Sequence, residues 1–494
     1  MTSEIVVIGA GPAGARLARR LGDAARVTVV GEESHAPYNR VLLAEVLAGR
    51  YGPEVIALPG VPVRRGVRAL AVDRDRRLVH CSDGAALRYD RLVLATGSNP
   101  VLPPLRGLGP GLPDGVHPFR TLDDCAALAA ATAVPGTRAV VVGGGLLGVS
   151  AARALASRGA KVVLAQQGEH LMERQLDPVA SALLRVHLEG LGVEVHTECR
   201  ARGLRTGGDG AVRAVVLADG FPLDAEVVVL ACGVRPRVGL AVDAGLDVRR
   251  GIVVDDELRT SDPRIHAIGD CAEHDGVVHG LAGPALDQAD ALAGVLLAEV
   301  DGGTAPPPRY TGTRALTRLT LAGAVPAPGP AAGPVPGRAP APSAGPAAGS
   351  APEATPVPAA AGLPPGTAGE PARAAAGPVP GTAGPAPGPP AGRAGAPAPD
   401  LATAPAPGPV TPQPALDIAA FGDPVPRPGD DVVQLADATR GAYRKVVVRE
   451  DRLVGGVLLG DLGAVGDLAR AWEGDEALPA SVPLLHLLTD DGGP

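Results

Sequence analysis

The amino-acid sequence predicts an α/β fold with two similar parallel-sheet units and a smaller α+β domain near the C-terminal end. Two β-branched runs, near residues 5–8 and 139–142, each break into three glycines and then into an apolar helical pattern. A third observation is the composition of residues 324–414, where Pro, Ala and Gly replace almost every bulky residue. Strands that alternate with helices favour a doubly wound sheet, and the change in composition separates it from the last domain.

The first unit opens with IVVIGAGPAG, which predicts a strand, a tight turn and the start of a helix. In such a turn Gly9 allows the sharp bend, Gly11 lets a pyrophosphate approach the backbone, and Gly14 lets the helix pack closely on the strand. The anion then lies at the helix N-terminus, where free N–H groups and the helix dipole favour it. The predicted contact residues are Gly9, Gly11, Pro12, Ala13 and Gly14.

A carboxylate after the second strand makes this loop more specific than a lone glycine cluster. The predicted strand Val27 to Gly31 leads into Glu32, and 32 minus 9 is 23 residues. At this offset a carboxylate can accept hydrogen bonds from the ribose hydroxyls of a dinucleotide. Glu33 is the alternative acceptor if the strand ends one residue later.

The segments that follow continue the α/β pattern. Residues 35–49 predict a loop and an apolar helix, and residues 78–82 and 87–90 predict antiparallel strands. Arg91 to Ala95 predicts a buried strand that ends in Thr96-Gly97.

The run AVVVGGGLLGVSAARALASRG repeats the strand, glycine and helix pattern. Its glycines are Gly143, Gly145 and Gly148, the helix starts at Leu146-Leu147, and Gln166 again lies 23 residues after the first glycine. Two bound dinucleotides, in two Rossmann-like domains, are therefore the simplest interpretation.

The residue at the end of this strand bears on the choice of nicotinamide nucleotide. An acidic residue would favour NADH and a nearby arginine NADPH. Gln166 and Gln167 are neither, and the next arginine is Arg174, which slightly favours NADH.

Further strands and one long helix complete the predicted core. Ala225 to Ala231 predicts an apolar strand before Gly233, and residues 251–273 predict a hairpin and a buried strand that ends at Gly269-Asp270. Residues 283–300 have helical periodicity. Beyond the Pro/Ala/Gly segment, which we expect to be a flexible linker, strands at 443–449 and 453–459 flank a turn, and residues 464–473 predict a helix.

Composition narrows the function classes. The formal net charge of -8 and the lack of basic runs disfavour a nucleic acid or an anionic membrane as the main partner. The first strand begins almost at the initiator methionine, and no apolar run reaches the length of a membrane span, which together predict a cytoplasmic protein. Five scattered cysteines without CxxC spacing predict buried thiols, with neither a metal site nor a disulfide framework.

The first loop, Ala95-Thr96-Gly97, the second loop and Ile268-Gly269-Asp270 occur in an order that resembles a known family. The chain resembles the pyridine nucleotide-disulfide oxidoreductases, flavoproteins with two dinucleotide folds, over roughly residues 4–300. The resemblance implies FAD in the first unit and NADH or NADPH in the second. It also implies that Asp270 binds the ribityl and phosphate part of FAD and that Arg40 contacts the FAD phosphates or the flavin edge.

A narrower resemblance is carried by YNRVLLAEVLAG (38–49), LMERQLDPVASALL (171–184) and TSDPRIHAIGDCAE (260–273). These segments are similar to the flavin-reductase part of assimilatory nitrite reductase large subunits and to nitrate reductase electron-transfer subunits; rubredoxin and ferredoxin reductases are close relatives. The resemblance implies an FAD-dependent NAD(P)H oxidoreductase that passes electrons to a separate redox protein. The alternatives are a rubredoxin or ferredoxin reductase, and a flavin-bearing interaction or sensor protein that uses the proline-rich segment as a partner ligand.

Three departures from the family pattern limit the chemistry. No cysteine follows Cys271, so we expect this chain not to carry the sirohaem and iron–sulfur chemistry of nitrite reduction. The helix after the first loop has no cysteine, which disfavours thiol–disulfide exchange. Many relatives pair a lysine and a glutamate near the flavin N5, and the matching positions here are Glu45 and Ser150, so no catalytic side chain is assigned.

The resemblance also predicts the domain boundaries. LTRLTLAG (316–323) and LDIAAFGD (416–423) look like two halves of one family segment, so we expect them to meet in space. The predicted domains are an FAD-binding domain at 1–118 and 240–303, an NAD(P)-binding domain at 119–239, a C-terminal interface domain at 308–323 and 415–490, and a disordered insert at 324–414.

Overall fold

A computed structural model describes residues 3–109, 111–301, 308–314, 316–322, 414–437, 439–474, 477–478 and 484–488. The Pro/Ala/Gly-rich insert lies outside these residues, apart from Pro414. Within the described chain, none of the helices has the length and apolar character that crossing a bilayer requires.

The first parallel sheet carries the first glycine loop. Its strand order is β19-β7-β1-β2-β3, and every neighbouring pair is parallel. The ends of these strands therefore share one edge, and Gly9, Glu32, Ala95 and Ile268 directly follow four of them. The strands are β1 (Glu4–Ile8), β2 (Arg26–Gly31), β3 (Val63–Arg65), β7 (Arg91–Leu94) and β19 (Ile265–Ala267).

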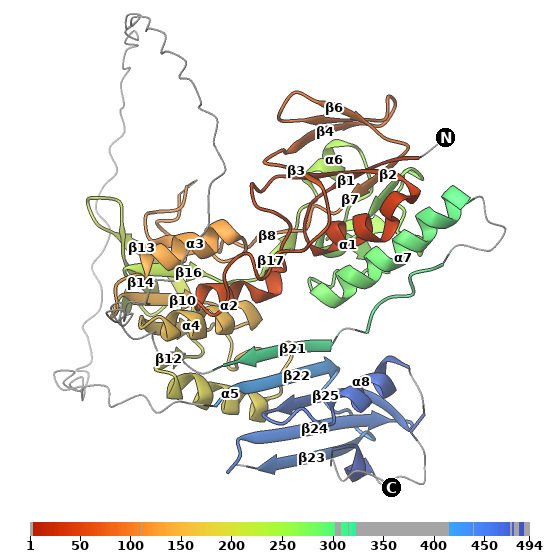
Figure 1. Ribbon diagram of the computed structural model, residues 1–494. Helices are drawn as coiled ribbons and strands as arrows, with labels where there is room; N and C mark the ends of the chain where they lie inside the picture. The colour runs from red at the N-terminus through yellow and green to blue at the C-terminus, as the bar shows by residue number, and fades with distance from the viewer. Residues whose placement is uncertain are drawn as a thin grey trace, which may run out of the picture. The chain divides into compact units, whose positions relative to one another are not determined.

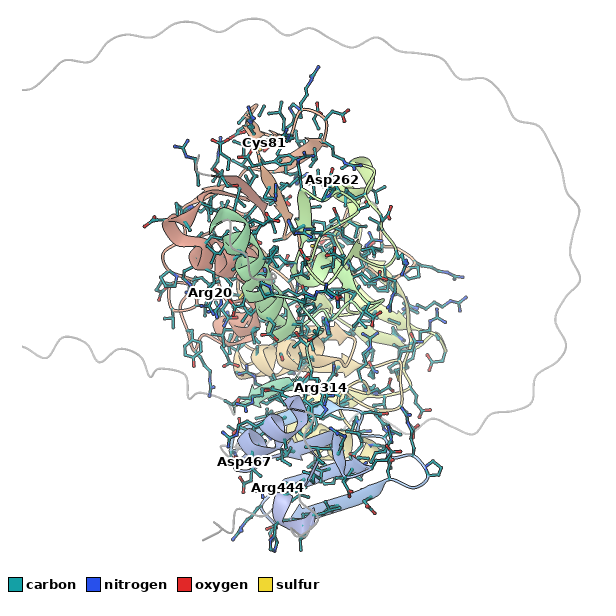
Figure 2. The ribbon with its side chains drawn as sticks, turned by 90° about the vertical axis from the view of Figure 1, so that its right-hand side faces the viewer. Arg20, Cys81, Asp262, Arg314, Arg444 and Asp467 are labelled. Carbon is teal, nitrogen blue, oxygen red and sulfur yellow. The ribbon has the colours of Figure 1, made fainter. Side chains whose placement is uncertain are left out.

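Two helices pack side by side on this sheet (Figure 1). They are α1 (Pro12–Leu21) and α7 (Ala282–Asp301). Arg16 of α1 makes two hydrogen bonds of 2.8 and 2.7 Å to Asp290 of α7, and Arg20 donates to the same carboxylate at 2.8 Å. Figure 2 shows Arg20 next to α7. The helix that begins at the first glycine loop is thus tied to the last helix of the same unit.

The second parallel sheet repeats this arrangement. Its order is β12-β11-β10-β16-β9, again with parallel neighbours, and Gly143 and Gln166 follow two of its strands. The strands are β9 (Val116–Pro118), β10 (Arg138–Val142), β11 (Lys161–Ala165), β12 (Val193–His196) and β16 (Val227–Leu230), and the helices are α2 (Leu43–Leu47), α3 (Leu122–Ala131), α4 (Leu146–Ser157) and α5 (Pro178–Gly190).

Several small sheets are added to the two parallel-sheet units and connect them. The antiparallel pairs include the expected β5 and β6. Their members are β4 (Ala69–Asp73), β5 (Leu78–Cys81), β6 (Ala86–Arg88), β8 (Ser98–Pro100), β13 (Ala201–Thr206), β14 (Val212–Leu217), β15 (Pro222–Asp224) and β17 (Val234–Pro236), with the short helix α6 (Gly239–Asp243) and the 3₁₀ turns Gly22–Ala24, Arg40–Leu42, Gly269–Cys271 and Leu484–Leu487.

The expected hairpin in residues 251–273 differs in its strand pairing. β18 (Ile252–Val254) pairs with β20 (Ala272–His274), and the two strands run parallel. Between residues of this segment, the described structure has antiparallel pairing as one isolated bridge, which joins Arg259 to His266. The Glu273 carboxylate fixes this arrangement, because it accepts hydrogen bonds from the backbone N–H groups of Arg250 and Gly251 at 2.8 and 2.9 Å.

The C-terminal sheet has the order β21-β22-β25-β24-β23, and its members are β21 (Leu316–Leu321), β22 (Leu416–Gly422), β23 (Asp431–Asp437), β24 (Ala442–Arg449) and β25 (Arg452–Leu459). β21 and β22 pair antiparallel, with Leu321 opposite Leu416, which confirms that the two flanks of the insert meet. The expected hairpin also forms: Glu450 and Asp451 adopt φ values of 48° and 59°, as the tight turn between β24 and β25 requires.

The two faces of the C-terminal sheet have different partners. One face packs on α8 (Val465–Glu473), where Phe421 lies 5.4 Å from the Trp472 ring. The opposite face shares one buried core with the helices of the second unit, in which Leu184 and Leu188 of α5 join Leu459. In Figure 1, α5 lies against this sheet.

Candidate functional site

A large cleft of about 2100 Å³ lies at the carboxyl ends of the strands of both parallel sheets. This is the position at which doubly wound sheets bind ligands. All but two of the predicted site residues line it: Gly9, Gly11, Pro12, Ala13, Glu32, Glu33, Arg40, Ala95, Thr96, Gly97, Gly143, Gly145, Leu146, Leu147, Gln166, Gly233, Gly269 and Asp270. The other two, Gly14 and Gly148, lie in the first turns of α1 and α4 and pack beneath the loops.

The third glycine of each loop is required by packing. A Cβ atom on Gly14 would lie 2.0 Å from the carbonyl oxygen of Gly9, and one on Gly148 would lie 1.8 Å from the carbonyl oxygen of Gly143. Gly9 itself has φ of 117°, and its Cβ would lie 2.0 Å from the Ala95 carbonyl oxygen. A side chain at Gly14 or Gly148 would therefore push the helix away from its glycine loop, and one at Gly9 would push the loop away from Ala95.

The second glycine of each loop faces open space. For Gly11 the nearest atom to an added Cβ is Arg40 Nε at 3.9 Å, and for Gly145 nothing lies within 4 Å. Both residues are the N-caps of their helices, α1 and α4, with no side-chain hydrogen bond and no acidic residue in the first turn. The first N–H groups of each helix are thus left for an anion, and the two loops fit two pyrophosphates.

Glu32 and Glu33 form ion pairs with different arginines. Glu32, at the end of β2, pairs with Arg68 and, at 2.7 Å, with Arg237. Glu33 pairs with Arg40 and accepts the hydroxyl proton of Tyr38 at 2.6 Å. Burial is the main cause that raises the Tyr38 pKa, so this hydroxyl stays a donor.

Asp270 belongs to a polar cluster that joins the two units. Its carboxylate accepts from Ser98 Oγ at 2.8 Å and from Arg120 Nη2 at 2.5 Å. The adjoining Gly269 N–H donates to Gln288 Oε1 at 2.7 Å, and Gln288 is buried. Sequence reasoning missed Arg120 and Gln288, because their partners lie 150 and 19 residues away along the chain and no local pattern identifies them.

In the second unit, Gln166 is engaged with the glycine loop. Its Oε1 accepts from the Gly144 N–H at 2.8 Å and its Nε2 donates to the His170 carbonyl at 3.3 Å. Two arginines, Arg174 and Arg200, line the cleft near this strand end.

A family model for pyridine nucleotide-disulphide oxidoreductases matches residues 3–289, more than half of the chain. The chain belongs to the pyridine nucleotide-disulphide oxidoreductase family. Membership implies FAD and NAD(P)H as cofactors and oxidoreductase chemistry, for which the two loops and the cleft provide the space. A second model, the C-terminal domain of rubredoxin NAD⁺ reductase, matches residues 415–474.

Individual relatives agree with this assignment. The Bacillus subtilis assimilatory nitrate reductase electron transfer subunit is 36% identical over 304 residues, which are 59% of this chain and 38% of that protein. The Escherichia coli nitrite reductase (NADH) large subunit is 36% identical over 300 residues, 58% of this chain and 35% of that protein. The chain thus spans less than two fifths of the length of either relative.

A shorter relative is covered more fully. The ferredoxin–NAD⁺ reductase component of the Paraburkholderia xenovorans biphenyl dioxygenase system is 37% identical over 283 residues, 55% of this chain and 68% of that protein. Among solved structures, a putidaredoxin reductase in covalent complex with putidaredoxin superimposes with a TM-score of 0.69 at 22% identity, covering 98% of both chains. This structural likeness shows the fold.

Glu45 and Ser150, the two residues at the positions of the expected lysine–glutamate pair, lie on α2 and α4. Glu45 on α2 pairs with Arg153 on α4, whose side chain is only 1% exposed. Ser150, one turn before Arg153, lines the cleft and donates to the Leu146 carbonyl of its own helix at 2.8 Å. An acid on α2 and a base on α4 therefore form a buried ion pair, and sequence reasoning missed Arg153.

The five cysteines of this family member are free thiols; Cys81, Cys125 and Cys271 are buried, as expected, whereas Cys199 and Cys232 are only half-buried. Burial raises the pKa of Cys232, beside the second glycine loop, to about 11, and it also raises the pKa of the fully buried Cys271. Since the thiolate is the reactive form, both thiols are poor nucleophiles at neutral pH. Among the residues that the structure describes, no group of three or more His, Cys, Asp or Glu is arranged to hold a metal ion.

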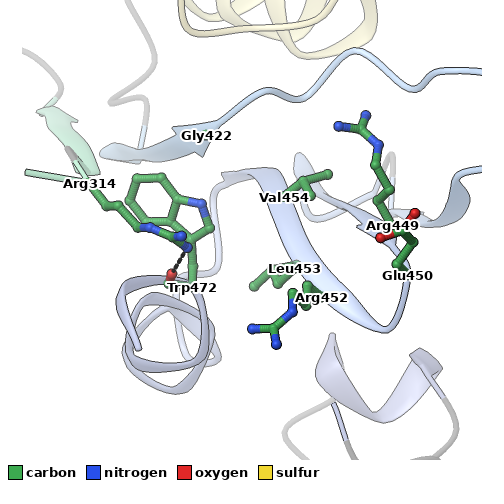
Figure 3. A pocket seen from close by; sticks show the side chains of 8 residues that line it. All are labelled: Arg314, Gly422, Arg449, Glu450, Arg452, Leu453, Val454 and Trp472. Carbon is green, nitrogen blue, oxygen red and sulfur yellow. Dashed lines mark hydrogen bonds between the residues drawn. The ribbon is translucent and has the colours of Figure 1, made fainter. Parts of the chain in front are cut away.

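A smaller hollow of about 350 Å³ lies on the C-terminal domain (Figure 3). Two arginines on its wall are engaged within the protein. Arg449 makes two hydrogen bonds of 2.8 Å to Asp430. Arg314 donates to the Trp472 carbonyl at 2.6 Å, and Figure 3 shows this bond as a dashed line. The first contact joins the end of β24 to the residue before β23, and the second joins the chain before β21 to α8. The large cleft remains the candidate site.

Proposed function

We propose that this protein is an FAD-dependent NAD(P)H oxidoreductase that passes electrons from a nicotinamide nucleotide, through its flavin, to a separate redox protein in assimilatory nitrate or nitrite reduction. The observation that carries the proposal is the pair of glycine loops, each leading into an uncapped helix N-terminus, that open into one cleft. When bound, FAD would accept a hydride and release electrons one at a time.

The residues of the first unit are assigned to FAD. The N–H groups at the start of α1 would bind the pyrophosphate and Glu32 the adenosine ribose, with Glu33 as the alternative. Asp270, oriented by Ser98 and Arg120, would accept from the ribityl hydroxyls. The proposed FAD contacts are Gly9, Gly11, Pro12, Ala13, Gly14, Glu32, Glu33, Arg40, Ala95, Thr96, Gly97, Gly269 and Asp270.

The residues of the second unit are assigned to the nicotinamide nucleotide. The N–H groups at the start of α4 would bind its pyrophosphate, and the residues after β11 and β16 would border its adenosine and nicotinamide ends. The proposed contacts are Gly143, Gly145, Leu146, Leu147, Gly148, Gln166 and Gly233. The proposed domains are an FAD-binding domain at 1–118 and 240–303, an NAD(P)-binding domain at 119–239, and a C-terminal interface domain at 308–323 and 415–490.

A separate electron acceptor is supported by the relatives and by the thiols. The names of two relatives describe an electron transfer subunit and a ferredoxin–NAD⁺ reductase component. The raised pKa values of Cys232 and Cys271 disfavour a dithiol acceptor within the cleft. Free cysteines also suit a reducing compartment, so we propose a cytoplasmic location.

The test is anaerobic reduction of purified holoprotein. The protein should be yellow, and either NADH or NADPH should bleach it before an acceptor restores the colour. A protein that binds no FAD on reconstitution would contradict the proposal. The acceptor screen should compare a nitrate or nitrite reductase catalytic subunit with rubredoxin and ferredoxin, because faster reduction of a small carrier would favour the alternative of a rubredoxin or ferredoxin reductase.

The preferred nucleotide needs its own test. NADH is slightly favoured because no arginine directly follows β11, but Arg174 and Arg200 on the cleft wall favour NADPH as the alternative. If NADPH is preferred, Arg174→Ala with Arg200→Ala should lower kcat/KM for NADPH while that for NADH changes little. Equal losses with both nucleotides would show that these arginines do not recognise a 2′-phosphate.

A further inference from the structure

A buried ionic network links the C-terminal sheet to the second unit. Asp177 accepts a hydrogen bond from Tyr443 Oη at 2.6 Å and from Lys445 Nζ at 2.9 Å, both on Oδ2. All three residues are buried, with exposed fractions of 5% for Asp177, 0% for Tyr443 and 7% for Lys445. Tyr443 and Lys445 are alternate residues of β24 and so point from the same face of the sheet.

Asp177 also ends the segment that borders the cleft. It is the N-cap of α5, where its Oδ1 accepts from the Ala180 N–H at 2.9 Å. In the chain before it, residues 166–168 and 172–175 line the cleft beside the second glycine loop. Thus Asp177 has the C-terminal sheet on one side and the nucleotide-binding segment on the other.

The cleft-lining segment is in direct contact with the glycine loop. The Met172 N–H donates to the Gly144 carbonyl at 2.9 Å, and the Leu176 N–H donates to the Met172 carbonyl at 2.9 Å. A Cβ on Gly144 would lie 2.6 Å from Leu171 Cδ2, so the two pieces of chain touch. Met172 has φ of 51°, a conformation that a non-glycine residue keeps only when its surroundings hold it.

We propose that Asp177, Tyr443 and Lys445 are positioning residues for the nicotinamide nucleotide: the C-terminal sheet holds residues 166–177 against the second glycine loop and so sets nucleotide affinity from outside the cleft. This inference rests on the proposed function, since it concerns the same site. The C-terminal domain then has a role in nucleotide binding as well as in packing.

The energetics favour a fixed arrangement. A buried carboxylate is costly unless its lone pairs are satisfied, and Asp177 has three donors. Burial opposes ionisation of Asp177, but hydrogen bonds from Tyr443, Ala180 and Lys445 outweigh it and lower its pKa. The Asp177 carboxylate is therefore ionised at neutral pH, and the loss of one donor leaves part of it without a hydrogen bond and lets the segment shift.

The experiment measures nucleotide binding in FAD-loaded Tyr443→Phe and Lys445→Met proteins. Each variant should raise the Kd for NAD⁺ or NADP⁺ by about fivefold, the size of effect that the loss of one hydrogen bond has. FAD content, the visible flavin spectrum and kcat at saturating nucleotide should stay close to the unaltered protein. The result is thus a change in KM at constant kcat.

A matched control separates positioning from general loss of stability. Val446 directly follows Lys445 on the same strand and is buried on the opposite face, in the core around α8. Val446→Ala should lower the melting temperature without changing the nucleotide Kd. An equal rise in Kd in this control, or an unchanged Kd in both network variants, would overturn the inference.

A double variant adds a test of the charge pair. The double variant Asp177→Asn/Lys445→Met removes both charges. Its loss of nucleotide binding free energy should therefore be smaller than the sum of the losses in the single variants Asp177→Asn and Lys445→Met. Additive effects would contradict a shared network. Unaltered holoprotein that binds neither nucleotide would instead contradict the proposed function, which keeps the two failures apart.

Discussion

The second glycine of each loop is the residue at which folding and cofactor binding can be separated. Gly9 and Gly14 have no room for a Cβ, whereas Gly11 and Gly145 border open space and have φ values of -72° and -77° that any residue can adopt. A side chain at Gly11 or Gly145 should therefore leave the protein folded and remove the space through which a pyrophosphate reaches the backbone.

We expect Gly11→Val to lower FAD affinity on the order of tenfold or more, and Gly145→Val to do the same for the nicotinamide nucleotide with FAD retained. FAD content by absorbance and nucleotide Kd by titration measure the two effects. Gly9→Ala serves as the contrasting variant, because it should lower the yield of folded protein. Loss of FAD in Gly145→Val would mean that the two loops do not serve separate cofactors.

His266 makes stability depend on pH. It is completely buried in β19, and burial is the main cause that lowers its pKa to about 4, although the Glu299 carboxylate acts in the opposite direction. The unfolded chain takes up a proton near the ordinary pKa of about 6.5, so the folded state loses stability as pH falls from about 6.5 towards 4.

Between pH 7.5 and pH 5, His266 should cost about 2 kcal/mol of unfolding free energy. Urea unfolding at the two pH values measures this loss. Over the same pH interval, the unfolding free energy of His266→Leu should fall by about 2 kcal/mol less than that of the unaltered protein, whatever the stability of the variant at pH 7.5. An equal pH dependence in both proteins would show that other groups cause the acid destabilisation.

At the scale of elements, the pair α1 and α7 fixes the helix that begins at the first loop. Asp290 receives two hydrogen bonds from Arg16 and one from Arg20, and these hydrogen bonds are the main cause of its lowered pKa. Because Arg16 contacts Asp290 through two parallel hydrogen bonds, this partly exposed pair should stabilise the fold more than an ordinary surface ion pair does.

Asp290→Asn should lower the unfolding free energy by about 1 kcal/mol and weaken FAD binding, because α1 carries the pyrophosphate site at its N-terminus. Chemical unfolding and FAD titration measure the two effects. Asp287→Asn on the same helix is the control, since Asp287 acts on Arg16 only through its charge at a distance. If the control has the same effect, the contact at Asp290 is not the cause.

The elements also show what a sequence can predict. Strand–glycine–helix units and the turn at Glu450-Asp451 depend on local periodicity and backbone conformation, so their positions were predictable. The pairing of β18 with β20 was not, because it depends on Glu273 contacting backbone groups more than twenty residues away. The partners Arg120–Asp270 and Lys445–Asp177 are 150 and 268 residues apart, and no local pattern identifies such pairs.

At the scale of the whole molecule, the insert divides the C-terminal sheet in sequence but not in space. β21 and β22 are antiparallel neighbours over their whole length, from Leu316 opposite Phe421 to Leu321 opposite Leu416. A two-residue turn can join two strands that end opposite each other. The sheet itself therefore has no need of the long connection between these strands.

Replacing residues 323–414 by an Asn-Gly turn should preserve FAD content, nucleotide Kd and turnover with the acceptor. Loop closure costs about 0.6 kcal/mol for each doubling of length, so shortening the connection from roughly 90 residues to a few should stabilise the protein by up to about 3 kcal/mol. Thermal unfolding and steady-state kinetics measure both expectations. If turnover is unchanged but a partner protein no longer binds, the interaction or sensor alternative gains support. If turnover falls while FAD content and the melting temperature are maintained, the insert takes part in electron transfer itself, and a passive connection is ruled out.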